Sequence, residues 1–309
     1  MSKSKGFSLV ELAVALAIIA LLLAGALIPL STQMEVRNVA DTRRTMESIR
    51  EAITGFAQAN GRLPCPAAGN LAAGTEQFTA PSCTALMGVV PWATLGVSET
   101  DSWGRRFSYR VSPAFADSVE NPPGTPFATW NTRATAYTPP APPPTFLPQS
   151  VSSPPSPANQ APSCNLTTPP TLSSFALCSL GDIAVFTQVR VGPTTTVVPL
   201  GVALPAVIIS HGKNGFGAWQ ANGTRLNPIP PVGNNDEAAN VNGNTQATPA
   251  GGYPSWAFYS RTPTPAAAGC IDPVFPATNT APSCGFDDIV MMITSNALIA
   301  RMVAAGRLP

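Results

Sequence analysis

The sequence predicts an α+β fold in which one long N-terminal helix packs on an antiparallel β-sheet head. The first observation is an uncharged, mostly apolar run over residues 12–30. The second is a stripe of apolar residues at helical spacing between residues 35 and 59. The third is the chain after Gly61, where short apolar segments alternate with turns rich in glycine and proline. Elements of these kinds bury their apolar faces against one another.

The apolar run is long enough to cross a membrane. Its nineteen residues approach the ~20 that span a ~30 Å hydrocarbon core as a helix. Lys3 and Lys5 precede the run and place the N-terminus in the cytoplasm by the positive-inside rule. Glu11, at the start of the run, is costly there without a cationic partner. The same residues also fit a plain signal anchor, or a secretory signal peptide cleaved after Ala26.

The helix is predicted to continue well beyond the apolar run. No proline occurs between residues 35 and 59, and Asn60-Gly61 provides a stop signal. A helix over residues 7–59 would be about 80 Å long, with a bend at Pro29. We expect its second half to pack mainly on the protein's own sheet. The apolar stripe that predicts this packing consists of Val36, Val39, Met46, Ile49, Ile53 and Phe56.

The stretch "KGFSLVEL" combines Gly6, the aromatic Phe7 and Glu11 at the edge of the apolar run. This pattern resembles the class III signal of type IV prepilins and type II secretion pseudopilins. The resemblance implies that a prepilin peptidase cleaves after Gly6 and methylates the new N-terminus at Phe7. It also implies an assembly role for Glu11, which would pair with the terminal amine of a neighbouring subunit. The family's helix-bending proline usually falls one residue earlier than Pro29.

The resemblance implies a structural function in a pilin-like fold. The chain would be a minor subunit of a type IV pilus or a type II secretion pseudopilus, with other subunits, prepilin peptidase and an inner-membrane assembly platform as partners. It would cross the bacterial inner membrane once, with a periplasmic head, before entering the filament. The alternative is an exported cell-surface binding or adhesive protein. The predicted segments are a leader (1–6), a transmembrane helix half (7–30), an amphipathic helix half (31–60) and a head (61–309).

The composition also favours an exported protein. Proline (35) and glycine (24) are abundant, whereas charged residues make up only 11% of the chain, less than half the usual quarter. The net charge of +1 gives no electrostatic indication of nucleic-acid binding. Residues 138–170 contain twelve prolines and are predicted to form an insertion within one domain, or alternatively a hinge between two.

The six cysteines are predicted to form disulfides. They lack C-x-x-C spacing and lie far in sequence from the single histidine, which disfavours a zinc site. Six cysteines permit fifteen connectivities. We choose nearest neighbours because each such pair brackets an irregular loop; buried free thiols are the alternative. The predicted pairs are Cys65–Cys83, Cys164–Cys178 and Cys270–Cys284.

Several segments of the head have recognisable local patterns. "DSWGRRFSYRV" is predicted to be a turn followed by a strand, and it resembles the Asp-x-Trp-Gly turn of pseudopilin heads. Strands are also predicted in "GDIAVFTQVRV" and "PAVIISHGKNGFG", and at residues 289–293. A short helix over residues 296–305 is expected to end the chain.

Among the possible catalytic and ligand-binding sites, only one candidate metal site is retained from the sequence. "SHGKNGFG" lacks the phosphate-loop spacing, and Ser210 and His211 lack a G-x-S-x-G elbow, so we expect no enzyme and no organic cofactor. The asparagine-rich stretch after Gly233 offers the oxygen donors that calcium prefers, without EF-hand spacing. The calcium-binding loop of major pseudopilins supports this candidate, but a solvated loop of asparagine and glycine is the favoured interpretation. The candidate ligands are Asn234, Asn235, Asp236, Glu237 and Asn242.

Overall fold

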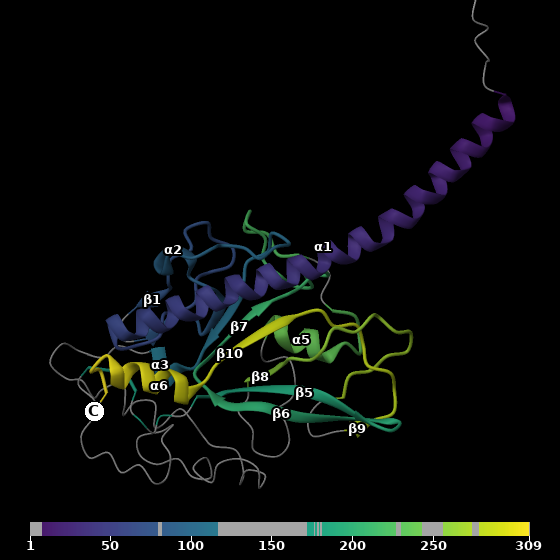
Figure 1. The fold of residues 1–309 in the computed structure, drawn as a ribbon. Coiled ribbons are helices and arrows are strands. Elements are labelled where there is room, and N and C mark those ends of the chain that lie inside the picture. Colours follow the sequence, from purple (N-terminus) through teal and green to yellow (C-terminus); the bar gives the residue numbers. More distant parts are fainter. Residues whose placement is uncertain are drawn as a thin grey trace, which may run out of the picture.

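A computed structural model shows an α+β protein, with a mainly antiparallel β-sheet head carried on a long N-terminal helix (Figure 1). Side chains of residues 21–32 and of Asn242 are outside the description. The structure describes residues 8–79, 82–116, 172–175, 177, 179, 181–226, 230–242, 256–273 and 278–308.

Helix α1 (Leu9–Asn60) contains 52 residues and is therefore about 78 Å long. It begins at the N-cap Ser8 and ends at Gly61, whose left-handed φ of 73° is favourable for a residue without a Cβ. These bounds confirm the predicted helix to within two residues at each end. Among the helices of the described residues, none meets the length and apolarity required of a membrane span.

The predicted stripe on α1 is buried only where the helix lies over the head. Met46, Ile49 and Ile53 are fully buried, whereas Val36 is exposed. Figure 1 explains the difference, because the helix leaves the head and projects away from it toward its N-terminus. The predicted packing is therefore confirmed at Met46, Ile49 and Ile53 and is wrong at Val36.

The sheet beneath α1 has the strand order β10-β7-β4-β3, and all its pairs are antiparallel. Tyr109 and Val111 of β4 share one buried cluster with Met46 and Ile53 of α1. The terminal helix α6 (Ser295–Ala304) packs beside α1 and adds Leu298 to this cluster. The strands are β3 (Met87–Val89), β4 (Ser108–Val111), β7 (Ala206–Ser210) and β10 (Ile289–Ile293).

A second sheet, not anticipated as a separate layer, has the order β8-β5-β6-β9. It packs on the other face of the first sheet, because Val207 and Ile209 of β7 share a cluster with Ile183 of β5 and Phe258 of β8. Within it, β5 and β8 pair in parallel, whereas the other strand pairs of the described residues are antiparallel. The strands are β5 (Ile183–Val191), β6 (Thr194–Leu204), β8 (Trp256–Tyr259) and β9 (Thr278–Asn279).

Short elements and two disulfides complete the described head. Cys65 is bonded to Cys83, and Cys270 is bonded to Cys284, with Cα–Cα separations of 5.4 and 4.9 Å. Both bonds match predicted pairs. The predicted Cys164–Cys178 pair and the proline-rich insertion lie outside the described residues. The short elements are β1 (Phe78–Thr79), β2 (Ser82–Cys83), α2 (Trp92–Leu95), α3 (Pro113–Ala116) and α5 (Asn235–Asn242).

Candidate functional sites

The first turn of α1 forms a capping box. The backbone N–H of Glu11 donates to Ser8 Oγ at 3.2 Å, and the Ser8 N–H donates to Glu11 Oε2 at 2.9 Å. These bonds satisfy amide groups that a helix start leaves without partners. The Glu11 carboxylate also lies at the positive end of the helix dipole. Glu11 therefore has a partner in its own chain, which the sequence did not anticipate. Gly6 and Phe7 lie outside the described residues.

The segment that begins directly after Ser8 exposes its apolar side chains around the helix. Their exposed fractions lie between 52% and 85%. Contiguous apolar surface of this kind is characteristic of a protein or membrane contact. The residues concerned are Leu9, Val10, Leu12, Val14, Leu16, Ile18 and Ile19.

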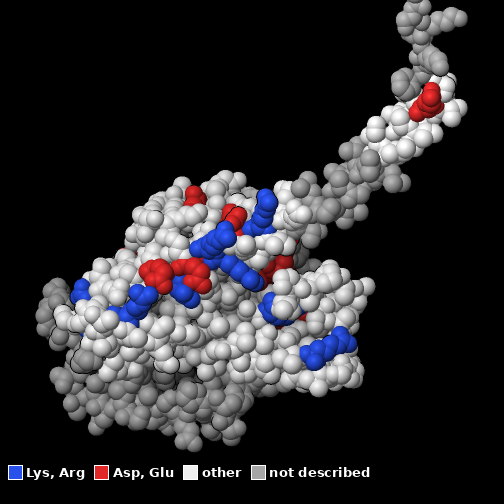
Figure 2. Space-filling view, in the orientation of Figure 1, with Lys and Arg blue, Asp and Glu red and all other residues white. Residues whose placement is uncertain are grey.

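Charged side chains gather farther along the same helix, where it lies on the head (Figure 2). Arg50 pairs with Glu47 at 2.6 Å, and Arg301 of α6 pairs with Glu51 at 3.2 Å. All four side chains are well exposed, so each pair contributes only about 0–1 kcal/mol. The polar face of α1 is therefore a solvated surface of mixed charge.

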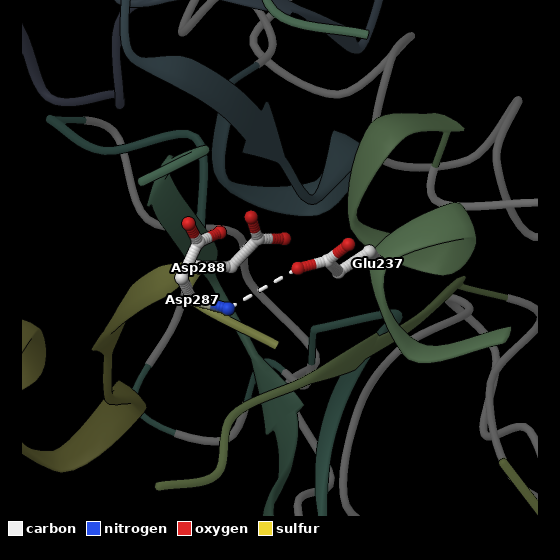
Figure 3. Close-up of side chains that lie close together, drawn as sticks. All are labelled: Glu237, Asp287 and Asp288. Atoms are coloured by element: carbon white, nitrogen blue, oxygen red, sulfur yellow. Dashed lines mark hydrogen bonds between the residues drawn. The ribbon is translucent and has the colours of Figure 1, made fainter. Parts of the chain in front are cut away.

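A cluster of three carboxylates lies between α5 and the chain just before β10 (Figure 3). Oxygens of Glu237, Asp287 and Asp288 all lie within 4.8 Å of one another. Glu237 is fixed by Asn214, whose Nδ2 donates to Oε1 at 2.8 Å, and by Asn234, whose Nδ2 donates to Oε2 at 2.7 Å. The Asp287 N–H also donates to Glu237 Oε1 at 3.1 Å.

Burial and mutual repulsion raise the pKa values of Glu237 and Asp287. Burial raises the pKa of Glu237 to about 8, and the Asp288 carboxylate adds to the rise. Burial likewise raises the pKa of Asp287 to about 6, again with a contribution from Asp288. Glu237 and Asp287 therefore hold their protons to higher pH than exposed carboxylates do.

The preceding residue of α5 belongs to a different cluster. Arg261 Nε donates to Asp236 Oδ2 at 2.7 Å, and its Nη2 lies 3.3 Å from Asp272 Oδ1. Gln188 Nε2 donates to Asp236 Oδ2 at 2.7 Å. Burial nevertheless raises the pKa of Asp236 to about 8; Asp272 adds to the rise and Arg261 opposes it. The arginine bridges two buried carboxylates and compensates much of their charge.

The candidate calcium ligands thus face in different directions. Glu237 is one of the three clustered carboxylates. Asn234 lies beside it and donates a hydrogen bond to its Oε2 from the amide nitrogen. Asp236 faces Arg261, and Asn235 Nδ2 donates to the Asp272 carbonyl at 2.7 Å. Asp287 and Asp288 were missed as site residues. The acidic pair in "GFDD" was visible, but its proximity to α5 depends on tertiary packing.

Ser210 and His211, the two residues considered for hydrolysis, have separate partners. Ser210 Oγ donates to Asp101 Oδ2 at 2.6 Å, within the predicted Asp-x-Trp-Gly turn. His211 Nε2 instead lies 2.8 Å from Ser108 Oγ, and its Nδ1 lies 3.8 Å from Asp288 Oδ1. A 3.8 Å separation is too long for the hydrogen bond that orients a catalytic imidazole. These contacts position the loop after β7 and do not form a catalytic triad.

The fold defines an α+β head on a long helix whose free end is apolar and exposed. Residues 1–27 match the family model of the prokaryotic N-terminal methylation motif, which is the signal of type IV prepilins and pseudopilins. The motif supports a pilin- or pseudopilin-like exported subunit. It implies membrane-anchored export via the inner membrane, processing by prepilin peptidase and assembly with other pilins. No curated protein and no solved structure matches the chain.

Proposed function

We propose that the chain is a structural, non-enzymatic minor subunit of a type IV pilus or a type II secretion pseudopilus. The observation that carries this proposal is the exposed apolar segment of α1, which lies within the matched methylation motif. The helix end projects from the head and is therefore accessible to other subunits (Figure 1). A head spanning residues 61–309 exceeds the usual pilin head, which favours a minor or tip subunit over the main one.

The proposed life cycle begins in the inner membrane. The segment 7–30 crosses the membrane once, Lys3 and Lys5 stay in the cytoplasm, and the head is periplasmic. The two disulfides of the head are compatible with that oxidising compartment. Prepilin peptidase removes residues 1–6 and methylates Phe7. At the assembly platform, the apolar helices then leave the lipid and pack together in the filament.

Glu11 has two roles in this proposal. In the single chain its carboxylate accepts one hydrogen bond from the Ser8 amide. A carboxylate has lone pairs for further donors, so it can also accept from the Phe7 amine of a neighbour. A glutamate–amine pair removed from water would set the axial register, because an uncompensated charge there is costly. The cap stabilises the helix before assembly, and the charge acts during assembly.

The maturation step is tested by intact mass and N-terminal sequencing of the protein isolated from its host. A mature chain that begins with N-methylated Phe7 supports the proposal. A chain that begins at Leu27 contradicts it and favours an exported binding or adhesive protein with an ordinary signal peptide. A Gly6→Leu variant is the control, because it should remain unprocessed and should accumulate in the membrane.

The two roles of Glu11 are separated by two substitutions. Glu11→Gln keeps an oxygen that accepts from Ser8 but removes the charge, so membrane insertion should persist while filament incorporation falls at least tenfold. Ser8→Ala removes one capping hydrogen bond but keeps the charge, so incorporation should persist. Incorporation is measured by immunoblotting sheared filaments. Normal incorporation of Glu11→Gln would show that assembly does not need the charge of Glu11.

A further inference from the structure

We propose that Glu237, Asp287 and Asp288 form a binding site for a divalent metal cation, which joins α5 to the start of β10. This site acts within one head and does not depend on how the N-terminal helix assembles. Two ligands adjoin β10 and the third lies on α5, about fifty positions earlier in the chain. A cation there would link two segments that are otherwise joined mainly by side-chain hydrogen bonds.

In the described part of the chain, the three carboxylates are not ion-paired with a lysine or an arginine, although the nearby charge of Arg105 opposes the rise in the pKa of Asp287. Asp236, the next residue on α5, shows that the fold supplies such a partner elsewhere, because Arg261 lies 2.7 Å from its carboxylate. Three ionised carboxylates within 4.8 Å repel one another unless protons or a cation compensate them.

A second observation comes from His211, which approaches the cluster from the loop after β7. Its side chain is 1% exposed, and Nδ1 has no hydrogen-bond partner among the described residues. This nitrogen faces Asp288 Oδ1 at 3.8 Å, whereas Nε2 is held by Ser108. A buried nitrogen that is directed at the cluster without a hydrogen-bond partner among the described residues is a polar group that a bound species could satisfy.

The amide groups around the cluster orient its oxygens and add no positive charge. Asn214 and Asn234 donate to the two oxygens of Glu237, and Asn240 Nδ2 donates to Asp288 Oδ2 at 2.8 Å. Asp287 Oδ2 accepts from the Asn214 N–H at 2.8 Å, while its Oδ1 is buried without a partner in the described chain. Each carboxylate is therefore held in place with coordination capacity remaining.

The cluster is reached from a groove between α1 and β10. The groove has a volume of about 340 Å³, and Asp287 and Asp288 line it together with Glu35 and Glu47 of α1. Arg43 and Arg261 line the same groove, Glu35 lies 3.7 Å from Lys213, and Glu47 lies 2.6 Å from Arg50. The groove is therefore of mixed charge and provides an entry path to Asp287 and Asp288. Water within the groove can complete the coordination of a cation that the protein holds from one side.

The donor set favours hard cations. Carboxylate oxygens and water suit calcium, manganese and magnesium, and magnesium requires the most regular octahedron. The oxygens here come from two separate segments, so calcium or manganese should bind more tightly than magnesium. The proposed ligands share only Glu237 with the set expected from the asparagine-rich stretch.

The site is tested with the full chain in detergent micelles, after treatment with a chelator and dialysis. Calcium, manganese and magnesium chlorides are titrated separately by calorimetry, and thermal unfolding is followed with and without each cation. We expect one calcium or manganese ion per chain and a rise in the unfolding midpoint of several degrees. Absence of binding up to millimolar concentrations, or binding without a rise in the midpoint, overturns the proposal.

Matched variants separate the site from nonspecific binding. Glu237→Gln and Asp287→Asn should each weaken binding at least tenfold, whereas Glu51→Gln, an exposed acid of α1, should leave it unchanged. Without metal, Asp287→Asn should unfold no earlier than the wild type, because its amide oxygen can accept from the Asn214 N–H and its Nδ2 replaces an oxygen that has no partner among the described residues. Glu237→Gln keeps only one oxygen for the two donors Asn214 Nδ2 and Asn234 Nδ2, so its affinity is measured well below its own unfolding midpoint. Equal affinity in Glu237→Gln and the wild type places the cation elsewhere and overturns the proposal.

Discussion

The two ends of α1 are made from similar apolar residues but lie in opposite environments. Met46, Ile49 and Ile53 are fully buried against the head, whereas Leu12 and Leu16 are more than half exposed. At the head end, the apolar side chains are already removed from water by contacts within the same chain. At the N-terminal end, the exposed apolar side chains would be removed from water only by contact with lipid or with another protein. One helix thus combines a folding element with an assembly element.

The largest expected effect tests the buried end. Ile53→Ala removes a fully buried side chain from the cluster shared by α1 and the first sheet. It should lower the free energy of unfolding by about 2–5 kcal/mol, measured by denaturant titration of the full chain in detergent. Leu16→Ala is the matched control and should leave the stability of the head unchanged. Equal losses in the two variants would contradict the division of α1 into two parts.

The disulfide near the C-terminal end of α1 gives the next effect. Replacing Cys65 and Cys83 together by serine opens a loop of 18 positions, which should cost on the order of 3 kcal/mol. The loss belongs to the head, so membrane insertion of the N-terminal segment should be unaffected. Urea unfolding measures the loss, and membrane fractionation provides the control. Reduced insertion of this variant would indicate that the head and the N-terminal segment are not independent.

The pH dependence of stability also belongs to the head. The pKa of Glu237 is about 8 in the folded protein, against 4.5 for an ordinary glutamate. Between these values the folded state holds a proton that the unfolded state has lost. The stability that Glu237 contributes to the metal-free head should therefore be fully present below pH 4.5 and should be lost between pH 4.5 and pH 8. Chelator-treated samples unfolded across this range measure the fall.

The Glu237→Gln variant provides the control for this pH dependence. It removes the titrating group, so the fall between pH 4.5 and pH 8 should become shallower. Asp236 keeps part of the slope, because burial raises its pKa to about 8 as well. A slope identical to that of the wild type would exclude Glu237 as its source.

The smallest effect concerns the start of the helix. Ser8→Ala removes one hydrogen bond of the capping box and should cost about 1 kcal/mol of local helix stability. Hydrogen exchange of the first-turn amides should accelerate, while exchange around Ile53 stays the same. Faster exchange at both ends would mean that α1 unfolds as a single unit.

Several features were determined by local sequence. The bounds of α1 follow from the absence of helix breakers and from Gly61 at its end. The methylation motif lies in a continuous stretch and needs no tertiary information. Strand β10 coincides with the predicted residues 289–293 because its apolar run is short and flanked by turn residues. The two observed disulfides join neighbouring cysteines, so the loops between them indicated the pairing.

The acidic cluster was decided only by the tertiary structure. Asp236 and Glu237 are adjacent acids, and no local rule distinguishes them, yet one faces Arg261 and the other faces two carboxylates. Their partners lie 25 to 51 positions away and are brought close by the tertiary fold, in which α5 packs against β8. The sequence by itself determined the helix, its processing signal and its exposed apolar end, because these depend on neighbouring residues. Only the folded chain decided which charges are compensated, because that depends on contacts between distant segments.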